Sequence, residues 1–291
     1  MNNRDNSVQP NVESDTVAGF GDEWTRFDQS ILGEAEVKED FEIYFGIFPW
    51  KVLPPQAIGF DLGCGSGRWA KLVAPRVHKL HCIDASIDAL AVAQRNLSLL
   101  ENCEFHHATV DSIPLGDESM DFGFSLGVLH HVPDTFAGIQ SCVAKLKSGA
   151  PFLIYLYYAF DGRPAWYRWI WRASDYLRKA ISRLPHNWRY WFSQVFAVLV
   201  YFPLARGSLI LEKCGLSVRN FPLAFYRNRS FYAMRTDALD RLGTRMEHRF
   251  SREQIRSMLE RTGLEDIQFS DKAPFWCAIG IKSDRRNHVK E

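Results

Sequence analysis

An apolar stretch that runs directly into alternating glycines constrains this chain more than any other feature. Residues 57–62 are mostly apolar, and Gly63, Gly65 and Gly67 then occupy every second position before Arg68. Glycine adopts positive φ at no steric cost and allows another group to approach the backbone closely. The pattern is typical of a strand that turns tightly into a helix beside a ligand, although such a turn by itself also occurs as a plain structural turn.

Short apolar runs and helix-compatible segments alternate around this turn. We expect strands at 57–62, 80–84, 104–107, 122–126 and 152–158, with helices between them such as 87–100 and 135–146. Ser251 and Gln254 form a capping box and Gly263 ends the helix that follows, which predicts a helix over 252–262 and a last strand over 275–281. This order predicts an α/β fold with a parallel sheet covered by helices.

The composition is that of an ordinary globular protein. Of the 291 residues, 46% are hydrophobic and 24% charged, which excludes wholesale disorder, and the net charge of +1 gives no global attraction to nucleic acid. The six cysteines form no CxxC pair, so a reducing cytoplasm is the simpler setting. The first fifteen residues lack the pattern of a secretory signal and are expected to be a disordered lead.

Asp84 ends the second expected strand, twenty-three residues after Asp61. An acidic side chain at this place in an open α/β sheet can accept hydrogen bonds from ribose hydroxyls. The alternative is an acid that stabilises the N-terminus of the next helix. The position of Asp84 in the series, directly after the glycine turn and its helix, favours the ribose contact.

The segment Asp61-Leu62-Gly63-Cys64-Gly65-Ser66-Gly67 resembles the first motif of the class I S-adenosylmethionine-dependent methyltransferases of the small-molecule type, an acidic residue, any residue, then Gly-x-Gly-x-Gly. Dinucleotide oxidoreductases use Gly-x-Gly-x-x-Gly and P-loops end in Gly-Lys-Ser/Thr, and neither pattern is present. The resemblance continues through 121–134, which contains a His-His-Val-Pro-Asp run, and through 146–150. It implies a Rossmann-like, seven-stranded, mostly parallel sheet with helices on both faces. It also implies S-adenosyl-L-methionine as cofactor and S-adenosyl-L-homocysteine as product.

The same resemblance assigns roles to single residues. It implies that Asp61 helps hold the methionine amino group, that the glycines pass beneath the cofactor and that Asp84 holds the ribose. Thr109 stands where the family usually has an acid that faces the adenine amine, so this contact falls to the Thr109 hydroxyl or to Asp111. The residues expected to bind the cofactor are Asp61, Leu62, Gly63, Cys64, Gly65, Gly67, Asp84, Ala85, Thr109, Val110, Asp111 and Leu126.

Methyl transfer from a sulfonium is an in-line displacement, so the enzyme must chiefly position the acceptor and exclude water. His130 and His131 follow the fourth expected strand and are the candidate bases, with a role in shaping the loop as the alternative. Histidines 106 and 107 are expected to be structural, and no metal site is expected. Arg227 and Tyr232 are the candidate acceptor contacts, and a solvated turn explains them equally well.

Five regions follow from these patterns. They are the lead over 1–15, a helical lid over 16–53 that includes Phe20 and Trp24, a cofactor-binding core over 54–161, a helical insertion over 162–249 that caps the acceptor, and a C-terminal helix and strands over 250–291 that complete the core.

The insertion is basic and rich in tryptophan. From 163 to 206, eight Arg or Lys residues stand against the single acid Asp175, with five tryptophans among them. Apolar residues recur at steps of three or four, which predicts an amphipathic helix suited to peripheral contact with an anionic membrane through 164–205. Packing on the core or in a homodimer explains the pattern as well. The run 191–205 is short for a membrane span and is not predicted to be one. The apolar positions are Trp166, Ile170, Ala173, Leu177, Ile181 and Leu184.

The sequence therefore predicts a methyltransferase that acts on a small acceptor, with a weak preference for an apolar or ring-bearing one. A lipid-like acceptor at a membrane, another enzyme class on the same fold, and a non-catalytic interaction protein are the alternatives. No nucleic acid partner is expected, because the basic patch comes without a recognisable binding module. The expected location is the cytoplasm, with membrane association if the insertion docks there.

Overall fold

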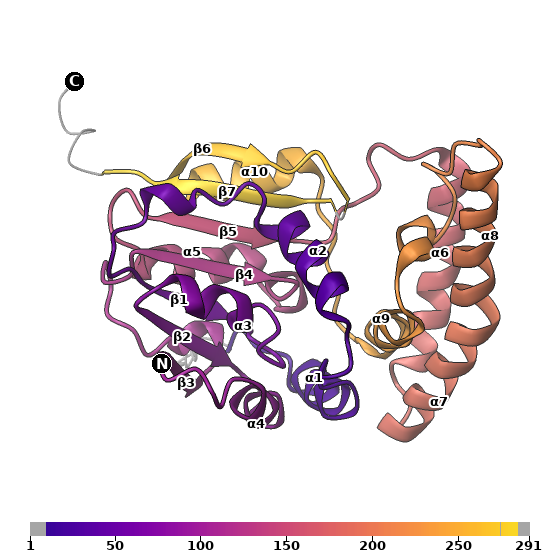
Figure 1. Cartoon of the computed structure of the whole chain (residues 1–291), viewed down its shortest axis with the longest axis horizontal. Helices are drawn as coiled ribbons and strands as arrows, with labels where there is room; N and C mark the ends of the chain where they lie inside the picture. Colours follow the sequence, from indigo (N-terminus) through magenta and orange to yellow (C-terminus); the bar gives the residue numbers. More distant parts are fainter. Residues whose placement is uncertain (1–9, 274, 285–291) are drawn as a thin grey trace, which may run out of the picture.

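The computed structural model describes residues 10–273 and 275–284, and its centre is a seven-stranded sheet with the order β3-β2-β1-β4-β5-β7-β6 (Figure 1). Strands β1 to β5 pair in parallel, and β7 alone is antiparallel, to both β5 and β6. The predicted seven-stranded, mostly parallel sheet is confirmed. The strands are β1 (Ile58–Leu62), β2 (Lys79–Asp84), β3 (Cys103–His107), β4 (Phe122–Leu126), β5 (Pro151–Tyr155), β6 (Leu264–Phe269) and β7 (Cys277–Lys282).

Helices cover both faces of the sheet. On one face, α5 (Thr135–Lys145) and α10 (Arg252–Arg261) bury Ile139 and Ile255 in a core that also contains Phe60 of β1. On the other face, α2 (Glu34–Phe45), α3 (Ala70–Val73) and α4 (Ile87–Asn96) enclose a second core around Phe122 of β4. From β1 the chain continues to β2 and β3 on one side and then to β4 and β5 on the other side. In open α/β sheets, ligands bind at such a switch point, at the carboxyl ends of the strands.

Two phenylalanines of the central strands lie across glycines of the neighbouring strand. Gly59 pairs with Phe122 and Gly123 pairs with Phe60. A Cβ at Gly59 would stand 2.3 Å from the Phe122 ring, and a Cβ at Gly123 would stand 2.3 Å from the Phe60 ring. Glycine in a strand interior often marks such a close approach, so these residues allow β1 and β4 to pair with a large ring on each face.

Residues 11–15 pack on the rest of the chain or belong to the start of a helix, which corrects that part of the disordered lead predicted over 1–15. Residues 1–9 of that lead lie outside the described part of the chain. Asn11 is buried, and its Nδ2 donates a hydrogen bond to the Asp134 carbonyl at 2.8 Å. Helix α1 (Ser14–Arg26) then begins, capped by the Glu13 carboxylate, which accepts from the Thr16 N–H at 2.7 Å. These contacts hold the start of α1 on the loop that precedes α5.

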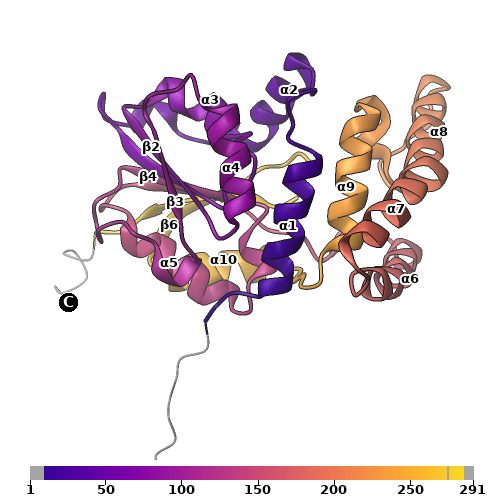
Figure 2. The same ribbon diagram turned by 90° about the horizontal axis from the view of Figure 1, so that it is seen from below.

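The chain leaves the sheet after β5 and returns to the core at α10, and the residues between them include those of the expected insertion, 162–249. The insertion contains α6 (Ala165–Ile181), α7 (His186–Phe196), α8 (Phe202–Lys213) and α9 (Phe231–Gly243). Figures 1 and 2 show these helices beside the sheet domain, with α9 innermost next to α1 and α6 to α8 outermost. A five-residue π-helical segment joins α7 to α8, so His186–Lys213 is one 28-residue helix. By length and composition this helix is apolar enough to cross a membrane, and 28% of its most apolar window is buried.

Several predicted boundaries differ from those in the structure. The strand expected over 152–158 ends at Tyr155, because the chain then turns so that the Ala159 N–H donates to the Phe250 carbonyl at 2.9 Å. The strand expected over 275–281 begins at Cys277. Helix α4 ends at Asn96 instead of residue 100. The predicted capping box of α10 is confirmed, since Ser251 and Gln254 each bond to the backbone of the other.

Candidate functional site

The glycine turn lies at the carboxyl end of β1 and has no room for side chains. Gly63, Gly65 and Gly67 have φ of +77°, +54° and +78°. A Cβ would lie 2.3 Å from Val128 at Gly63, 2.9 Å from Trp24 at Gly65 and 2.8 Å from Leu97 at Gly67. All three glycines are therefore required for the turn, and Gly65 for the approach of α1 as well.

Asp84 ties this turn to the next helix. One of its carboxylate oxygens accepts from the Gly65 N–H at 2.9 Å and the other from the Ser86 N–H at 2.8 Å, and Ser86 is the N-cap of α4. Burial raises the pKa of Asp84. The two interpretations of Asp84 from the sequence are compatible, because one carboxylate lies beside both the glycine turn and the start of α4.

A cavity of about 130 Å³, here called the Asp84 pocket, opens beside this carboxylate. The carboxyl ends of the strands form one side of this pocket, and α1 with the segment before it, including Phe20 and Trp24, forms the other. Seven predicted cofactor residues line it, namely Leu62, Gly63, Asp84, Ala85, Thr109, Val110 and Leu126. The segment before and within α1 adds Asn11, Val12, Glu13, Thr16, Val17, Phe20 and Trp24.

The sequence leaves two candidates for the contact with adenine, Thr109 and Asp111. Thr109 lines the Asp84 pocket, and its hydroxyl shares a hydrogen bond of 3.1 Å with Ser112. Asp111 does not line this pocket, because its carboxylate is turned to the Asn11 N–H. The geometry thus favours Thr109, and Asn11 was not found from the sequence because the segment before α1 carried no motif.

Asp61 lies behind the glycine turn and lines neither pocket described here. It is 1% exposed, and its Oδ2 atom has no hydrogen-bond partner among the described residues. Burial raises the pKa of Asp61 well above its usual range, and the nearby Asp84 carboxylate raises it further. A buried carboxylate oxygen without a donor is costly, so this part of the site fits a ligand that carries an ammonium group.

A second cavity of about 170 Å³, here called the Asp237 pocket, lies on the other side of the turn. It shares Phe20, Trp24, Gly63, Leu126 and Gly127 with the Asp84 pocket. The predicted residues Cys64 and Gly65 line this second pocket, whereas Gly67 lines neither. Its aromatic wall consists of Phe20, Trp24, Tyr44, Trp69, Tyr155, Tyr157, Phe225 and Tyr226, and its charged residues are Glu23, Glu36, Asp40, Arg68, Arg229, Asp237 and Asp240.

The carboxylates that line the Asp237 pocket differ in whether a basic side chain pairs with them. Asp40 is paired with Arg68 and, at 2.7 Å, with Arg229. No ion pair within residues 10–273 and 275–284 involves Glu23, Asp237 or Asp240. These three acids therefore form an excess of negative charge against the aromatic wall.

The pKa values of Glu23 and Asp237 are raised, first by burial and then by the neighbouring carboxylates. Burial raises the pKa of Glu23 well above its usual range, and Asp240 and Asp237 raise it further. Burial raises the pKa of Asp237 to about 7, while a hydrogen bond from Tyr226 acts in the opposite direction. The Tyr157 hydroxyl donates to the Asp240 carboxylate. A cation in this pocket would relieve the repulsion among the three acids.

Of the two candidate bases, His131 lines the Asp84 pocket, whereas His130 lines neither the Asp84 pocket nor the Asp237 pocket. The Met246 carbonyl, at 2.7 Å, can only accept, so it receives the Nδ1 proton of His131 and leaves Nε2 as a bare acceptor. His130 is fully buried between His131 and Tyr157, and neither of its ring nitrogens has a partner among the described residues. Burial lowers the pKa of both histidines, so both rings are neutral at neutral pH.

The predicted acceptor contacts Arg227 and Tyr232 are engaged with other residues, and their role stays a prediction. Arg227 pairs with Glu212 at 2.8 Å, and the Tyr232 hydroxyl accepts from the Gln29 N–H at 2.9 Å. Neither residue lines the Asp237 pocket. The same part of the insertion instead contributes Tyr226, Arg229, Ala233, Thr236, Asp237 and Asp240. The last four recur at helical spacing on one face of α9, a signal that was present in the sequence.

Residues 60–154 match the family model described as a methyltransferase domain. This part of the chain is a methyltransferase domain. A ubiquinone biosynthesis O-methyltransferase of Alkalilimnicola ehrlichii is 28% identical over 131 residues, which are 44% of this chain and 52% of the relative. A phosphoethanolamine N-methyltransferase of Caenorhabditis elegans is 33% identical over 101 residues, 33% of this chain and 23% of the relative.

The matches thus concern the methyltransferase domain, and the chain spans about half the length of the first of these relatives. A solved structure from Haloferax volcanii, of a complex that contains the Trm112 methyltransferase activator, aligns over 91% of this chain and 98% of the other with a TM-score of 0.50 and 12% identity. That likeness concerns the fold.

Proposed function

We propose that the protein transfers the methyl group of S-adenosyl-L-methionine to the amino group of a small acceptor in the Asp237 pocket, and releases S-adenosyl-L-homocysteine. The observation that carries this proposal is a group of three acids without an ion-pair partner among the described residues, the buried Glu23 and the half-buried Asp237 and Asp240, beside the glycine turn. In the reaction a carbon–sulfur bond breaks, a carbon–nitrogen bond forms, and the nitrogen loses a proton.

The Asp84 pocket fits the nucleoside end of the cofactor. Asp84 would hold the ribose, and Thr109 and Val110 lie where an adenine ring would rest. The unpartnered Oδ2 of Asp61 suits the methionine ammonium. When bound, the cofactor supplies an activated methyl group on its sulfonium. Helix α1 covers this region with Phe20 and Trp24, which would keep water away from the reacting atoms.

The Asp237 pocket fits a protonated amine with an apolar or ring-bearing body. Aromatic rings attract cations through their faces, and Tyr155 stands 5.2 Å from Tyr44 and 5.7 Å from Tyr157 between ring centroids. The acids would draw an ammonium into the pocket. Because the pKa of Asp237 is about 7, its carboxylate can accept the proton that the nitrogen must lose near neutral pH.

A hydroxyl acceptor is the second candidate function. The relative from Alkalilimnicola ehrlichii is named an O-methyltransferase, and the bare Nε2 of His131 beside the shared residue Phe20 could take a hydroxyl proton. The excess negative charge of the Asp237 pocket opposes the anion that a hydroxyl acceptor forms as it loses its proton. The geometry therefore supports the amine better.

The test combines calorimetry with a methyl-transfer assay. Titration should show binding of S-adenosyl-L-methionine and S-adenosyl-L-homocysteine but not of NAD. A panel of ring-bearing primary amines and the matched phenols is then assayed for methylated product, with the variants Glu23→Gln and Asp237→Asn. Asp22→Asn is the matched control, because Asp22 adjoins Glu23 on α1 but pairs with Arg26 at 2.8 Å.

We expect methylated amines, with at least a tenfold loss in both variants and no change in the control. Methylation of phenols alone, unaffected by Asp237→Asn, would establish the second candidate. Absence of cofactor binding would refute both and favour a non-catalytic interaction protein.

A further inference from the structure

The outer layer of the insertion carries most of the exposed apolar side chains of the described chain. Eighteen large hydrophobic residues are exposed among the described residues, and fourteen of them fall between Trp166 and Leu216. Soluble proteins rarely expose large contiguous apolar areas, and such areas mark interaction sites. The fourteen are Trp166, Trp169, Ile170, Tyr176, Leu177, Trp188, Trp191, Phe192, Val195, Val198, Leu199, Phe202, Ile210 and Leu216.

The long helix formed by α7 and α8 has two different faces. One face packs on α9 and the loop before it, with Arg235 donating to Gln194, and with Arg206 donating to the Arg227 carbonyl at 2.6 Å. The opposite face presents apolar side chains at steps of three and four from Trp188 to Phe202, and Leu199 is 69% exposed. The described chain provides no cover for this stripe.

Helix α6 shows the same asymmetry. It packs through Trp171, Arg178 and Ile181, and Arg178 donates to the Thr244 carbonyl at 2.8 Å. Most of the apolar positions of the predicted amphipathic pattern face solvent instead, among them Trp166 and Ile170. Core packing therefore does not account for the apolar pattern of α6.

Basic residues accompany this apolar face. From 163 to 213 the chain has nine Arg or Lys residues and two acids. Asp175 is paired with Arg178 and Lys179, and Glu212 is paired with Arg227, so neither acid offsets the remaining charge. The exposed basic residues of α6 and the turn after it are Arg168, Arg172, Lys179 and Arg183.

We propose that the outer face of α6, α7 and α8 docks on the surface of an anionic lipid bilayer. Tryptophans and arginines on an apolar helix face suit the boundary between headgroups and acyl chains. The helix lies in this boundary and does not cross the bilayer, because its polar face is engaged with α9. A second copy of the chain fits the face less well, since it would bring like charges together. This inference does not depend on the methylation chemistry.

The test is flotation of the full chain with two kinds of vesicle. One consists of phosphatidylcholine alone, and in the other about a third of the lipid is phosphatidylglycerol, which gives the surface a negative potential. We expect binding to the anionic vesicles that falls as salt is raised. Trp191→Glu with Leu199→Glu should lower the bound fraction at least tenfold, as should Arg168→Glu with Arg172→Glu. Leu99→Glu is the matched control, because Leu99 is 93% exposed on the sheet domain.

Absence of binding to either vesicle would overturn the proposal. Light scattering that shows a dimer which Trp191→Glu dissociates, without vesicle binding, would identify a second copy as the occupant and also overturn it. Equal loss in the Leu99→Glu control would do the same. A circular dichroism spectrum and an unfolding temperature like those of the unaltered chain show that each variant is folded.

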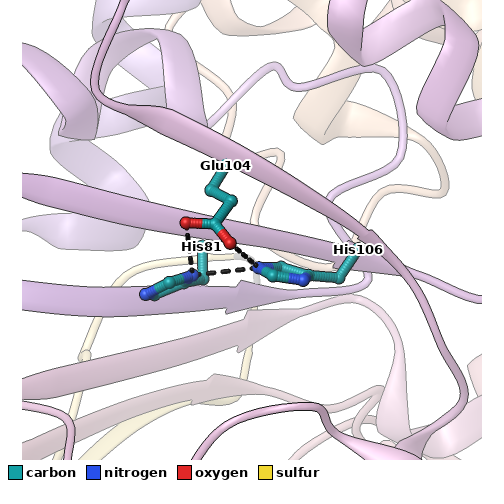
Figure 3. A group of neighbouring side chains, drawn as sticks. All are labelled: His81, Glu104 and His106. Atoms are coloured by element: carbon teal, nitrogen blue, oxygen red, sulfur yellow. Dashed lines mark hydrogen bonds and ion pairs between the residues drawn. The ribbon is translucent and has the colours of Figure 1, made fainter.

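A separate cluster of side chains lies on one face of the sheet at its edge. His81 of β2 stands opposite Glu104 of the edge strand β3, and His106 follows two residues later on the same face (Figure 3). His81 Nδ1 lies 2.9 Å from His106 Nε2, and the Glu104 carboxylate oxygens lie 3.5 Å from His106 Nε2 and 3.8 Å from His81 Nδ1. The three side chains thus point one ligand atom each toward a common point.

The geometry points to a zinc site formed by these three residues, although none was expected from the sequence. Two imidazoles and a carboxylate are preferred zinc ligands, and tetrahedral ligands at about 2.0–2.1 Å lie about 3.3 Å apart. The observed separations bracket that value. Binding must displace Lys79, whose Nζ is paired with Glu104. Glu104 is exposed, which leaves room for a water as fourth ligand. A bound ion would pin the edge strand β3 to β2.

Isothermal titration with ZnCl₂ and thermal unfolding with and without the ion test this site. We expect one ion per chain and a higher unfolding temperature, both lost in His106→Ala and Glu104→Gln. His78→Ala removes a histidine just before β2 and should change neither. No uptake by the unaltered chain, or equal uptake by His106→Ala, would overturn the assignment.

Discussion

Gly63 is a glycine for two reasons, its positive φ and the lack of space for a Cβ, and the substitution Gly63→Ala allows the two to be measured separately. At this position φ is +77°, and a Cβ would lie 2.3 Å and 2.6 Å from the two methyl groups of Val128. Gly149 is the matched control, because its φ is also +77° while nothing lies within 4 Å of its Cβ position. Both substitutions impose the same backbone conformation on alanine, but only the one at Gly63 adds a collision.

The expected magnitudes follow from these two contributions. Left-handed backbone costs a residue other than glycine about 1–2 kcal/mol, which is the loss of unfolding free energy expected for Gly149→Ala. Overpacking costs about 1–3 kcal/mol more, so Gly63→Ala should lose roughly 2–5 kcal/mol. In a Val128→Ala background the two methyl groups are absent, and we expect a coupling energy of about 1–2 kcal/mol from the double-mutant cycle.

Urea unfolding of the four Gly63 and Val128 combinations and of Gly149→Ala measures these energies. Titration with S-adenosyl-L-homocysteine should show at least a tenfold weaker affinity for Gly63→Ala and an unchanged affinity for Gly149→Ala, because only Gly63 lines the pockets. Equal destabilisation by the two single substitutions, with no coupling to Val128, would refute the steric argument. Unchanged affinity of Gly63→Ala would refute the placement of the ligand.

Three further predictions concern the site. Asp84→Ala should weaken cofactor binding by about 1.5–3 kcal/mol through lost charge-assisted hydrogen bonds, measured by calorimetry; unchanged affinity in a folded variant contradicts the ribose contact. His131→Ala should leave amine turnover intact, because Asp237 is the proposed proton acceptor there, and should lower any turnover of phenols, for which His131 is the candidate base; loss of amine turnover would contradict the assignment to Asp237. Because the folded pKa of Asp237 is about 7, above its ordinary value, amine kcat/KM should rise with pH through 7. The stability that this group contributes should be present at acidic pH and lost as pH rises through 7. Asp237→Asn should abolish both pH dependences, and a persistent rise in kcat/KM assigns the titration to another group.

Much of the expected cofactor site could be predicted, because the residues that indicate it are neighbours in sequence. The strand, the three glycines and Asp84 lie within twenty-seven residues that begin at Ile58, and each is recognised from its neighbours in sequence. The predicted residues that line no pocket, such as Gly67 and Asp111, still contact the site's surroundings, Gly67 against Leu97 and Asp111 with Asn11. Periodicity separates strands from helices but does not reveal which side chains border a cavity.

The proposed acceptor pocket was less predictable, because its residues come from distant parts of the chain and no local pattern marks them. Arg227 and Arg229 stand two residues apart, yet Arg227 pairs with Glu212 on the outer helix whereas Arg229 reaches Asp40 and lines the pocket. No local pattern distinguishes them. Likewise, the apolar spacing of α6 predicted an amphipathic helix, but the face that packs is the one through Trp171 and Arg178.

The sequence alone determined the α/β class, the glycine turn and the acid at the end of β2, because backbone conformation and hydrophobic periodicity are properties of neighbouring residues. The tertiary structure decided that Glu23 of α1 meets Asp237 and Asp240 of α9, more than two hundred residues away, without an arginine or lysine partner. Charge compensation and desolvation depend on everything that surrounds a group in space, so the character of the acceptor pocket became visible only once the chain was folded.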